Sequence, residues 1–152
     1  RDFMTEPDTK LWCSRYSAEH VHTWVTDYVD AEAYFCQPDY LSVLFGVSIE
    51  KAESWIKLAV DDCNGIRKTF FDKRRVINRV LYEDGGSENS EVLWDVLGKE
   101  SLGTTVGKIL HKKLKQVVKN DDCNDKLLDR FTVPSGYEIA PALKAIIEDM
   151  LK

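Results

Sequence analysis

Glycine and proline are scarce in this chain of 152 residues, which contains eight Gly and four Pro. They fall at breaks between segments with helical periodicity, whereas a β-fold with many turns would need more of both. Apolar residues make up 43% of the chain and charged residues 31%, which is typical of a globular domain and not of a disordered segment. The sequence therefore favours an all-α fold.

Long apolar runs are also missing. No segment approaches the roughly 18 consecutive apolar residues of a membrane-spanning helix. The opening Arg1-Asp2-Phe3 does not begin a signal-peptide pattern. We therefore expect no membrane partner. The separated cysteines, described next, favour an intracellular location, cytoplasmic or nuclear.

Cysteine pairs at close spacing do not occur. The four cysteines are far apart and form no CxxC motif. We expect reduced and mostly buried thiols, the alternative being a secreted protein with disulfides. They are Cys13, Cys36, Cys63 and Cys123.

Histidine is rare, with three residues in the chain. His20 and His22 are two positions apart on an expected helix, so their side chains diverge. Their spacing from Cys13 and Cys36 matches no ordinary zinc motif. His111 has no recognisable nucleophile beside it in the sequence. The histidines therefore predict neither a metal site nor a catalytic pair.

Nucleotide and calcium motifs are absent too. The segment 103–107 is rich in Gly and Thr but lacks the Lys-Ser/Thr ending of a phosphate loop. The pairs Asp61-Asp62 and Asp121-Asp122 are not followed by the alternating oxygen ligands of a calcium loop. We predict no catalytic residue, no metal and no cofactor.

Apolar side chains recur with helical spacing along most of the chain, which predicts a compact bundle of about seven or eight helices. The expected helices are 17–29, 38–45, 49–63, 66–82, 92–97, 106–119, 127–131 and 141–150. The residues expected to form the core faces are Val21, Trp24, Tyr28, Ile49, Trp55, Ile56, Leu110, Leu114, Val117, Leu143, Ile146, Ile147 and Met150.

Periodicity and composition also suggest how the chain is divided into an arm, a helical domain and a linker. Residues 1–15 show no clear period and are expected to form an N-terminal arm. Residues 16–152 are expected to form a single helical domain, or two subdomains, 16–82 and 91–152. The polar stretch 83–90, with two glycines, would be the linker between them.

Two basic tracts, at 67–79 and 108–119, stand out in a chain of net charge −5. They are either solvated helix faces or an electrostatic patch for an acidic partner or a phosphate backbone. The candidate patch residues are Arg67, Lys68, Lys73, Arg74, Arg75, Arg79, Lys108, Lys112, Lys115 and Lys119.

Four aromatic residues fall outside the clearest apolar stripes: Phe3, Trp12, Tyr16 and Tyr40, of which the last three are the candidate partner contacts. Exposed aromatic side chains commonly anchor protein interfaces. We therefore expect them to contact a partner protein.

Residues 16–25, Tyr-Ser-Ala-Glu-His-Val-His-Thr-Trp-Val, resemble the opening of a sterile alpha motif (SAM) domain. That family often begins with an aromatic residue, Ser, an acidic residue, Val and then Trp at this spacing. The short helices around a central Gly that typify the family are not recognisable in 26–65, and 91–152 lies beyond a domain of that size. The resemblance implies a protein–protein interaction or self-association module without enzymatic activity.

Together these patterns predict a non-catalytic protein–protein interaction or oligomerisation module of a larger intracellular protein. The alternative is a helical domain that binds nucleic acid through the basic tracts at 67–79 and 108–119. An enzyme is the third hypothesis, and no residue indicates its chemistry.

Overall fold

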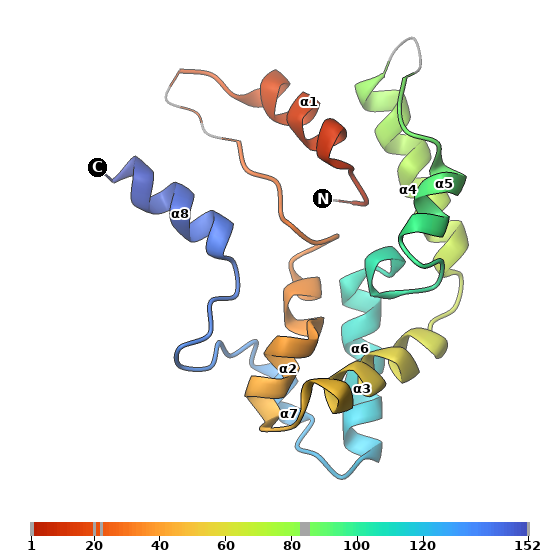
Figure 1. Ribbon diagram of the computed structural model, residues 1–152, viewed down its shortest axis with the longest axis vertical. Coiled ribbons are helices and arrows are strands. Elements are labelled where there is room, and N and C mark those ends of the chain that lie inside the picture. Colours follow the sequence, from red (N-terminus) through yellow and green to blue (C-terminus); the bar gives the residue numbers. More distant parts are fainter. Residues whose placement is uncertain (1, 20, 22, 83–85, 152) are drawn as a thin grey trace.

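The computed structural model describes residues 2–19, 21, 23–82 and 86–151, and within them the fold is all-α, as the sequence predicts (Figure 1). These residues form eight α-helices and two short 3-10 helices. The α-helices are α1 Glu6–Tyr16, α2 Pro38–Phe45, α3 Ile49–Asp61, α4 Ile66–Leu81, α5 Ser90–Val96, α6 Gly107–Asn120, α7 Lys126–Asp129 and α8 Pro141–Met150. The 3-10 helices are η1 Glu32–Cys36 and η2 Leu102–Thr104.

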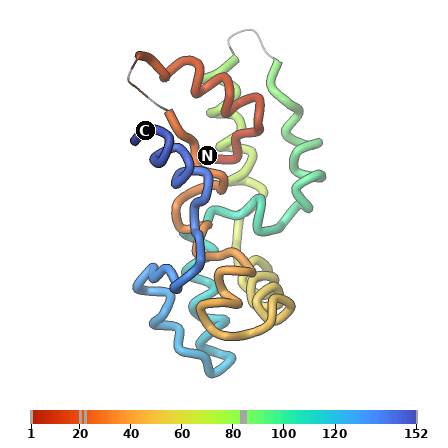
Figure 2. The backbone as a smooth tube through the Cα atoms, turned by 60° about the vertical axis from the view of Figure 1, so that its left-hand side comes forward, coloured from red at the N-terminus to blue at the C-terminus, as the bar shows by residue number. Residues whose placement is uncertain are grey.

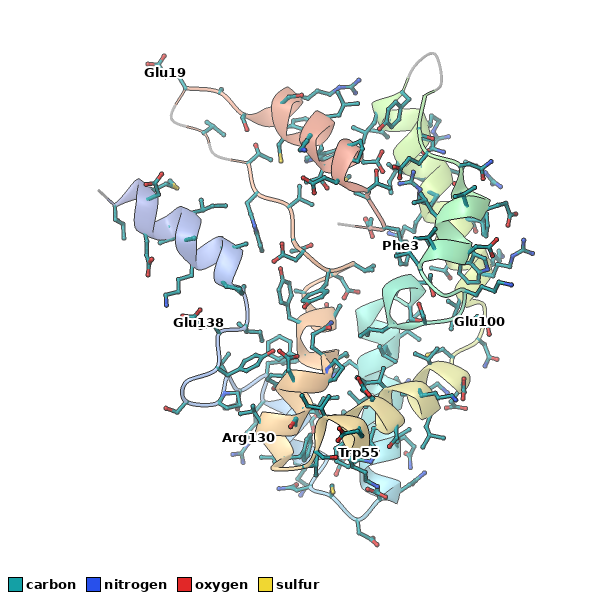
Figure 3. All side chains as sticks on the ribbon, in the orientation of Figure 1. Phe3, Glu19, Trp55, Glu100, Arg130 and Glu138 are labelled. Carbon is teal, nitrogen blue, oxygen red and sulfur yellow. The ribbon has the colours of Figure 1, made fainter. Side chains whose placement is uncertain are left out.

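The main core lies where α2, α3, α6 and η1 pack together. Trp55 is buried in the part of α3 that crosses α6 (Figure 3), and its indole N–H donates to Asp121 Oδ2 at 3.0 Å. Leu110 and Leu114 of α6 are fully buried in the same core, as their stripe predicts. The core thus combines helices from both sides of the 83–90 stretch.

The ends of these helices follow the signals in the sequence. Gly46 takes a left-handed conformation, with φ of +64°, and ends α2. The Ser48 hydroxyl accepts a hydrogen bond from the Lys51 N–H and caps α3. The expected helix at 66–82 is one continuous helix, α4, whose buried stripe includes Phe70 and Ile77.

The N-terminal prediction is wrong, because the expected arm contains helix α1. Its start is a capping box: the Thr5 side chain accepts from the Asp8 N–H, and Asp8 Oδ2 accepts from the Thr5 N–H at 2.8 Å. Pro7 lies in the first turn, where its missing N–H costs no hydrogen bond. The apolar residues of α1 form no clear stripe, which is why periodicity misses it.

The expected helix at 17–29 is also wrong in its described residues, and two of its expected core residues, Val21 and Tyr28, are exposed. Ser17 ends α1, and Ala18 and Val21 form an isolated bridge instead of a helical turn. Residues 23–31 are irregular and lead into η1. The β-branched residues Val21, Thr23, Val25 and Thr26 disfavour a helix here. The SAM resemblance rests on this segment, so the first-helix expectation that accompanies it fails.

Different helices lie at the two ends of the long axis of the molecule. In both Figure 1 and Figure 2, α1 and α5 lie at the end opposite to α2 and α7. The long helix α4 reaches toward the first end, where α1 packs against it. No helix in the described part of the chain is both long and apolar enough to cross a membrane.

The C-terminal helix α8 begins at Pro141, as expected, but the predicted burial of its apolar stripe is wrong. None of its residues is buried. Leu143 and Ile146 are half-buried, whereas Ile147 is 48% exposed and Met150 58% exposed. No other described helix packs extensively on α8, because the chain leaves the body after Ile139.

Candidate interaction surfaces

The three aromatic candidates have different environments. Tyr16 is 52% exposed near the end of α1, and its ring contacts the half-buried Trp12 with 4.6 Å between centroids. Tyr40 is fully buried, so its expected role as an exposed partner contact is wrong. Its hydroxyl donates to the Thr132 carbonyl at 2.9 Å, and burial raises its pKa to about 12. Tyr40 therefore ties the C-terminal segment to α2.

The basic tract of α4 is not a continuous cationic face. Arg74 is fully buried and pairs with Asp8, so its place in an exposed basic patch is wrong. Most of its neighbours pair with carboxylates of this chain. These pairs are Arg67 with Glu91 at 3.1 Å, Lys73 with Asp2 at 3.0 Å and Arg75 with Asp72 at 3.6 Å. Lys68 and Arg79 are exposed.

The basic tract of α6 is closer to the expected arrangement. Lys108, Lys112 and Lys119 are exposed, opposite the buried stripe. Lys115 is half-buried and pairs with Asp129, which follows α6 in the chain. The nucleic-acid hypothesis therefore retains fewer available cations than the sequence suggests, and it stays a prediction.

The acidic pairs bind lysines of neighbouring helices. Asp62 Oδ2 accepts from Lys113 at 2.6 Å, and Asp121 Oδ2 pairs with Lys51 at 2.7 Å. Within the described residues, no group of His, Cys, Asp and Glu is arranged to hold a metal ion. His20 and His22 lie outside the described residues.

All four cysteines are free. Cys36 is fully buried, and burial together with Asp30 and Glu32 raises the pKa of its thiol. Cys63 is half-buried, and its pKa is also raised, mainly by burial. A raised pKa keeps these thiols protonated and unreactive at neutral pH.

His111 is a buried titratable residue that the sequence reading did not place in the core. Its ring stacks on Phe131 with 4.9 Å between centroids. The imidazole also forms a hydrogen bond with the Leu128 backbone. Its Nε2 is buried without a hydrogen-bond partner. Burial, and then the nearby Lys115, lower its pKa. The arrangement joins α6 to the C-terminal segment and offers no nucleophile.

A concave surface of about 490 Å³ lies between the N-terminal residues, the segment before α2, and α5 with η2. We call it the N-terminal groove. Its walls are mostly apolar, and three carboxylate residues line it. The apolar residues include Phe3, Val29, Leu93, Leu97 and Leu102, and the acidic ones are Glu6, Asp27 and Glu88.

A second, shallower surface of about 570 Å³ lies between α8 and the chain that precedes it. We call it the C-terminal groove. Its apolar lining consists of Val133, Tyr137, Ile139, Ala140, Leu143 and Ile147. Tyr137 fixes one wall, since its hydroxyl donates to Asp39 Oδ2 at 2.9 Å.

Sequence reasoning missed both grooves for the same reason. Their walls combine segments that are far apart in the chain, such as Phe3 and Leu97, so no local motif marks them. The strongest sequence signal for the C-terminal groove is the apolar stripe of α8, which by itself predicts a core face.

Comparison with known proteins adds no assignment to these surfaces. No protein-family model, no curated protein and no solved structure matches the chain. The resemblance to SAM domains is therefore untested.

Proposed function

We propose that this chain is a non-catalytic protein–protein association module that pairs with a second copy of itself through α8 and the C-terminal groove. The observation that carries the proposal is the uncovered apolar stripe of α8. Leu143, Ile146, Ile147 and Met150 follow helical spacing, yet none is buried. An amphipathic helix with an uncovered apolar face is typical of an interaction surface.

The wall behind this helix is fixed to the body, which favours binding. The Tyr40 hydroxyl donates a hydrogen bond to the Thr132 carbonyl, and the Tyr137 hydroxyl donates one to Asp39. The two tyrosine rings also contact each other, with 5.6 Å between centroids. Ile139 packs against the main core. A preorganised wall lowers the entropy lost when a partner fills the groove.

The charges along α8 favour a second copy in antiparallel orientation. Lys144 lies in the N-terminal half of the helix, and Glu148 and Asp149 lie in the C-terminal half. Within the chain Lys144 pairs with Glu138 and, at 4.0 Å, with Glu148, and these pairs are weak because their side chains are largely exposed. A two-fold axis would place Lys144 of each copy beside the acidic half of the other, where it can exchange these partners. The same arrangement sets Leu143 opposite Met150 and the two central isoleucines against each other. Such a self-complementary contact closes as a dimer.

The expected dimer is weak because the contact is small. A helix of 10 residues is about 15 Å long. Even with the groove included, we expect a buried area at the low end of specific interfaces. Protein interfaces range from micromolar to picomolar, and we expect this one at the weak end, with a dissociation constant on the order of micromolar. The population of dimers should therefore change within an accessible concentration range.

The test is sedimentation velocity on the wild type and two matched variants. Ile147→Glu places a charge in the C-terminal groove, and Ala145→Glu adds the same charge at an exposed position outside it. We expect the wild type and Ala145→Glu to form dimers and Ile147→Glu to stay monomeric. Ile147 is 48% exposed, so its substitution should not unfold the chain. Equal behaviour of the two variants would refute the role of α8.

A further inference from the structure

We propose that the N-terminal groove binds a basic amphipathic peptide segment of another protein. This inference does not depend on self-association, because the groove lies on different elements from α8. Its recognition elements are an apolar floor and a rim of carboxylates, which call for apolar side chains flanked by Lys or Arg.

The apolar floor is supported by the core. Phe3 is buried and its ring lies 5.1 Å from that of Phe70 on α4. Val29, Leu93 and Leu102 pack against the main core from different segments. These contacts hold the floor in place before any ligand arrives, so binding would require little rearrangement. Figure 3 shows Phe3 near the start of the chain, on the side facing α4 and α5.

Leu97 lies on the same surface, but its side chain remains exposed to solvent. It follows the last residue of α5, lines the groove and is 40% exposed. A partner that covers it would remove apolar area from water, which is the favourable term in most protein associations. Leu97 is therefore the expected anchor point.

Three carboxylate residues from three different segments line the groove. Glu6 comes from α1, Asp27 from the irregular segment before η1, and Glu88 from the residues before α5. No Lys, Arg or His belongs to the lining residues that the structure describes. Two of the three carboxylates already have partners within the chain. Glu6 pairs with Lys10 at 3.5 Å, and because both side chains are largely exposed, a ligand cation can replace this weak contact. Asp27 Oδ2 accepts a hydrogen bond from the Tyr34 hydroxyl at 3.2 Å, so a ligand cation would bind Asp27 in addition to its partners in the chain.

The number of carboxylates in the lining favours a ligand with several positive charges. A small amine carries one charge and can neutralise only one of the three. A peptide with several Lys or Arg residues can meet all of them while its apolar side chains cover the floor. An anionic nucleic acid or lipid surface would be repelled.

The direct test is fluorescence polarisation with a labelled peptide of Leu and Lys at helical spacing, about 14 residues or four turns long. A second peptide carries Glu in place of every Lys. We expect the Leu/Lys peptide to bind at least about tenfold more tightly than the Leu/Glu peptide, and to weaken as salt rises. Absence of binding by the Leu/Lys peptide, or equal binding by both, would overturn the proposal.

Matched variants locate the binding surface. Leu97→Asp introduces a charge into the groove, whereas Val96→Asp introduces it at the adjacent residue, which is 77% exposed and does not line the groove. We expect about a tenfold loss of peptide affinity for Leu97→Asp and none for Val96→Asp. Equal loss in both would show non-specific attraction and contradict the proposal.

A charge-reversal pair controls for the net charge of −5. Glu88→Lys and Asp95→Lys change the net charge equally, but only Glu88 lines the groove. We expect weaker peptide binding for Glu88→Lys alone, and equal effects would overturn the assignment. Displacement of the peptide by an equal concentration of an alkylamine would assign the groove to a small cation instead.

The outcome is separable from that of the proposed function. Ile147→Glu, designed to prevent self-association, should bind the Leu/Lys peptide as the wild type does. A loss of peptide binding in that variant would contradict the independence of the two surfaces.

Discussion

Arg74 of α4 and Asp8 of α1 form an ion pair in which both side chains are fully buried. The Asp8 carboxylate also accepts hydrogen bonds from the Tyr82 hydroxyl at 2.7 Å and the Thr5 N–H at 2.8 Å. Arg74 donates in addition to the Phe3 carbonyl at 3.0 Å. This pair therefore fixes the start of α1 on α4 and positions Phe3 in the floor of the N-terminal groove, while Arg15 fixes the end of α1 through the Val80 and Leu81 carbonyls of α4, each at 2.8 Å.

Removing one partner of this pair should destabilise the chain strongly. Arg74→Met leaves the Asp8 charge buried and unpaired, for which the expected cost is about 3–5 kcal/mol. Urea unfolding followed by circular dichroism measures this loss. The adjacent Lys73→Met is the control, because Lys73 forms only a partly exposed pair with Asp2. A loss for Arg74→Met no larger than for Lys73→Met would contradict the structural role of the buried pair.

The stability of the chain should fall in acid as Asp8 is protonated. Burial tends to raise the pKa of Asp8, but the hydrogen bonds from Thr5, Arg74 and Tyr82 outweigh it and hold the pKa below its ordinary value. A carboxyl with a depressed pKa contributes stability above its unfolded pKa of about 3.9 and loses it as pH falls through the folded value. Asp8→Asn should therefore be less stable than the wild type at neutral pH, and this difference should shrink in strong acid.

His111 should add a separate pH dependence at higher pH. Its pKa is lowered by burial and by Lys115, against the opposing effects of the Leu128 hydrogen bond and of Asp129 and Glu32. The unfolded chain thus binds the proton more readily, and the stability contributed by neutral His111 is lost as pH falls below about 6.5. Thermal unfolding of His111→Leu between about pH 7.5 and 5 should show a smaller decrease than the wild type. An identical decrease would contradict the buried, neutral state of His111.

Gly107 should tolerate no side chain. A Cβ atom there would overlap Asp30 Oδ1 and the Ala33 backbone. The Asp30 carboxylate accepts from the Ala33 N–H at 3.0 Å and from the Lys108 N–H at 3.2 Å, so it joins η1 to the start of α6. Gly107→Ala should cost about 1–3 kcal/mol or more in unfolding free energy.

Gly103→Ala is the matched control for this substitution. Its Cβ would meet Leu97 at an ordinary 3.6 Å. Its unfolding midpoint should remain close to that of the wild type. Equal midpoints for Gly103→Ala and Gly107→Ala would show that the close approach of η1 to α6 is not present in solution.

Periodicity and capping signals predict the helices of the main core well. The stripe with Trp55 and Ile56 identifies the buried face of α3, although Ile49, expected on the same face, is 48% exposed at the start of the helix. Gly46 marks the end of α2. These features are local, so the sequence around them contains the information. The α1 capping box at Thr5 and Asp8 is equally local, but the absence of an apolar stripe hides it.

The failures concern contacts between distant residues. In the sequence Arg74 belongs to a basic tract, but in the fold it is buried in an ion pair with Asp8, 66 residues away. Tyr40 is expected to be exposed, but in the fold it is buried and its hydroxyl bonds to Thr132, 92 residues away. The stripe of α8 identifies an apolar face, but the sequence does not show whether another part of the chain covers it. The grooves are likewise formed by residues from separate segments, so neither could be predicted from the sequence.

Size-exclusion chromatography coupled to light scattering, over a concentration series of the wild-type chain, tests self-association through α8 most directly. We predict that the molar mass rises from that of the 17.5 kDa monomer toward twice that value as concentration increases. We also predict that Ile147→Glu stays at the monomer mass throughout. A wild-type chain that remains at the monomer mass up to about millimolar concentration, well above the micromolar range expected for this interface, would contradict the account.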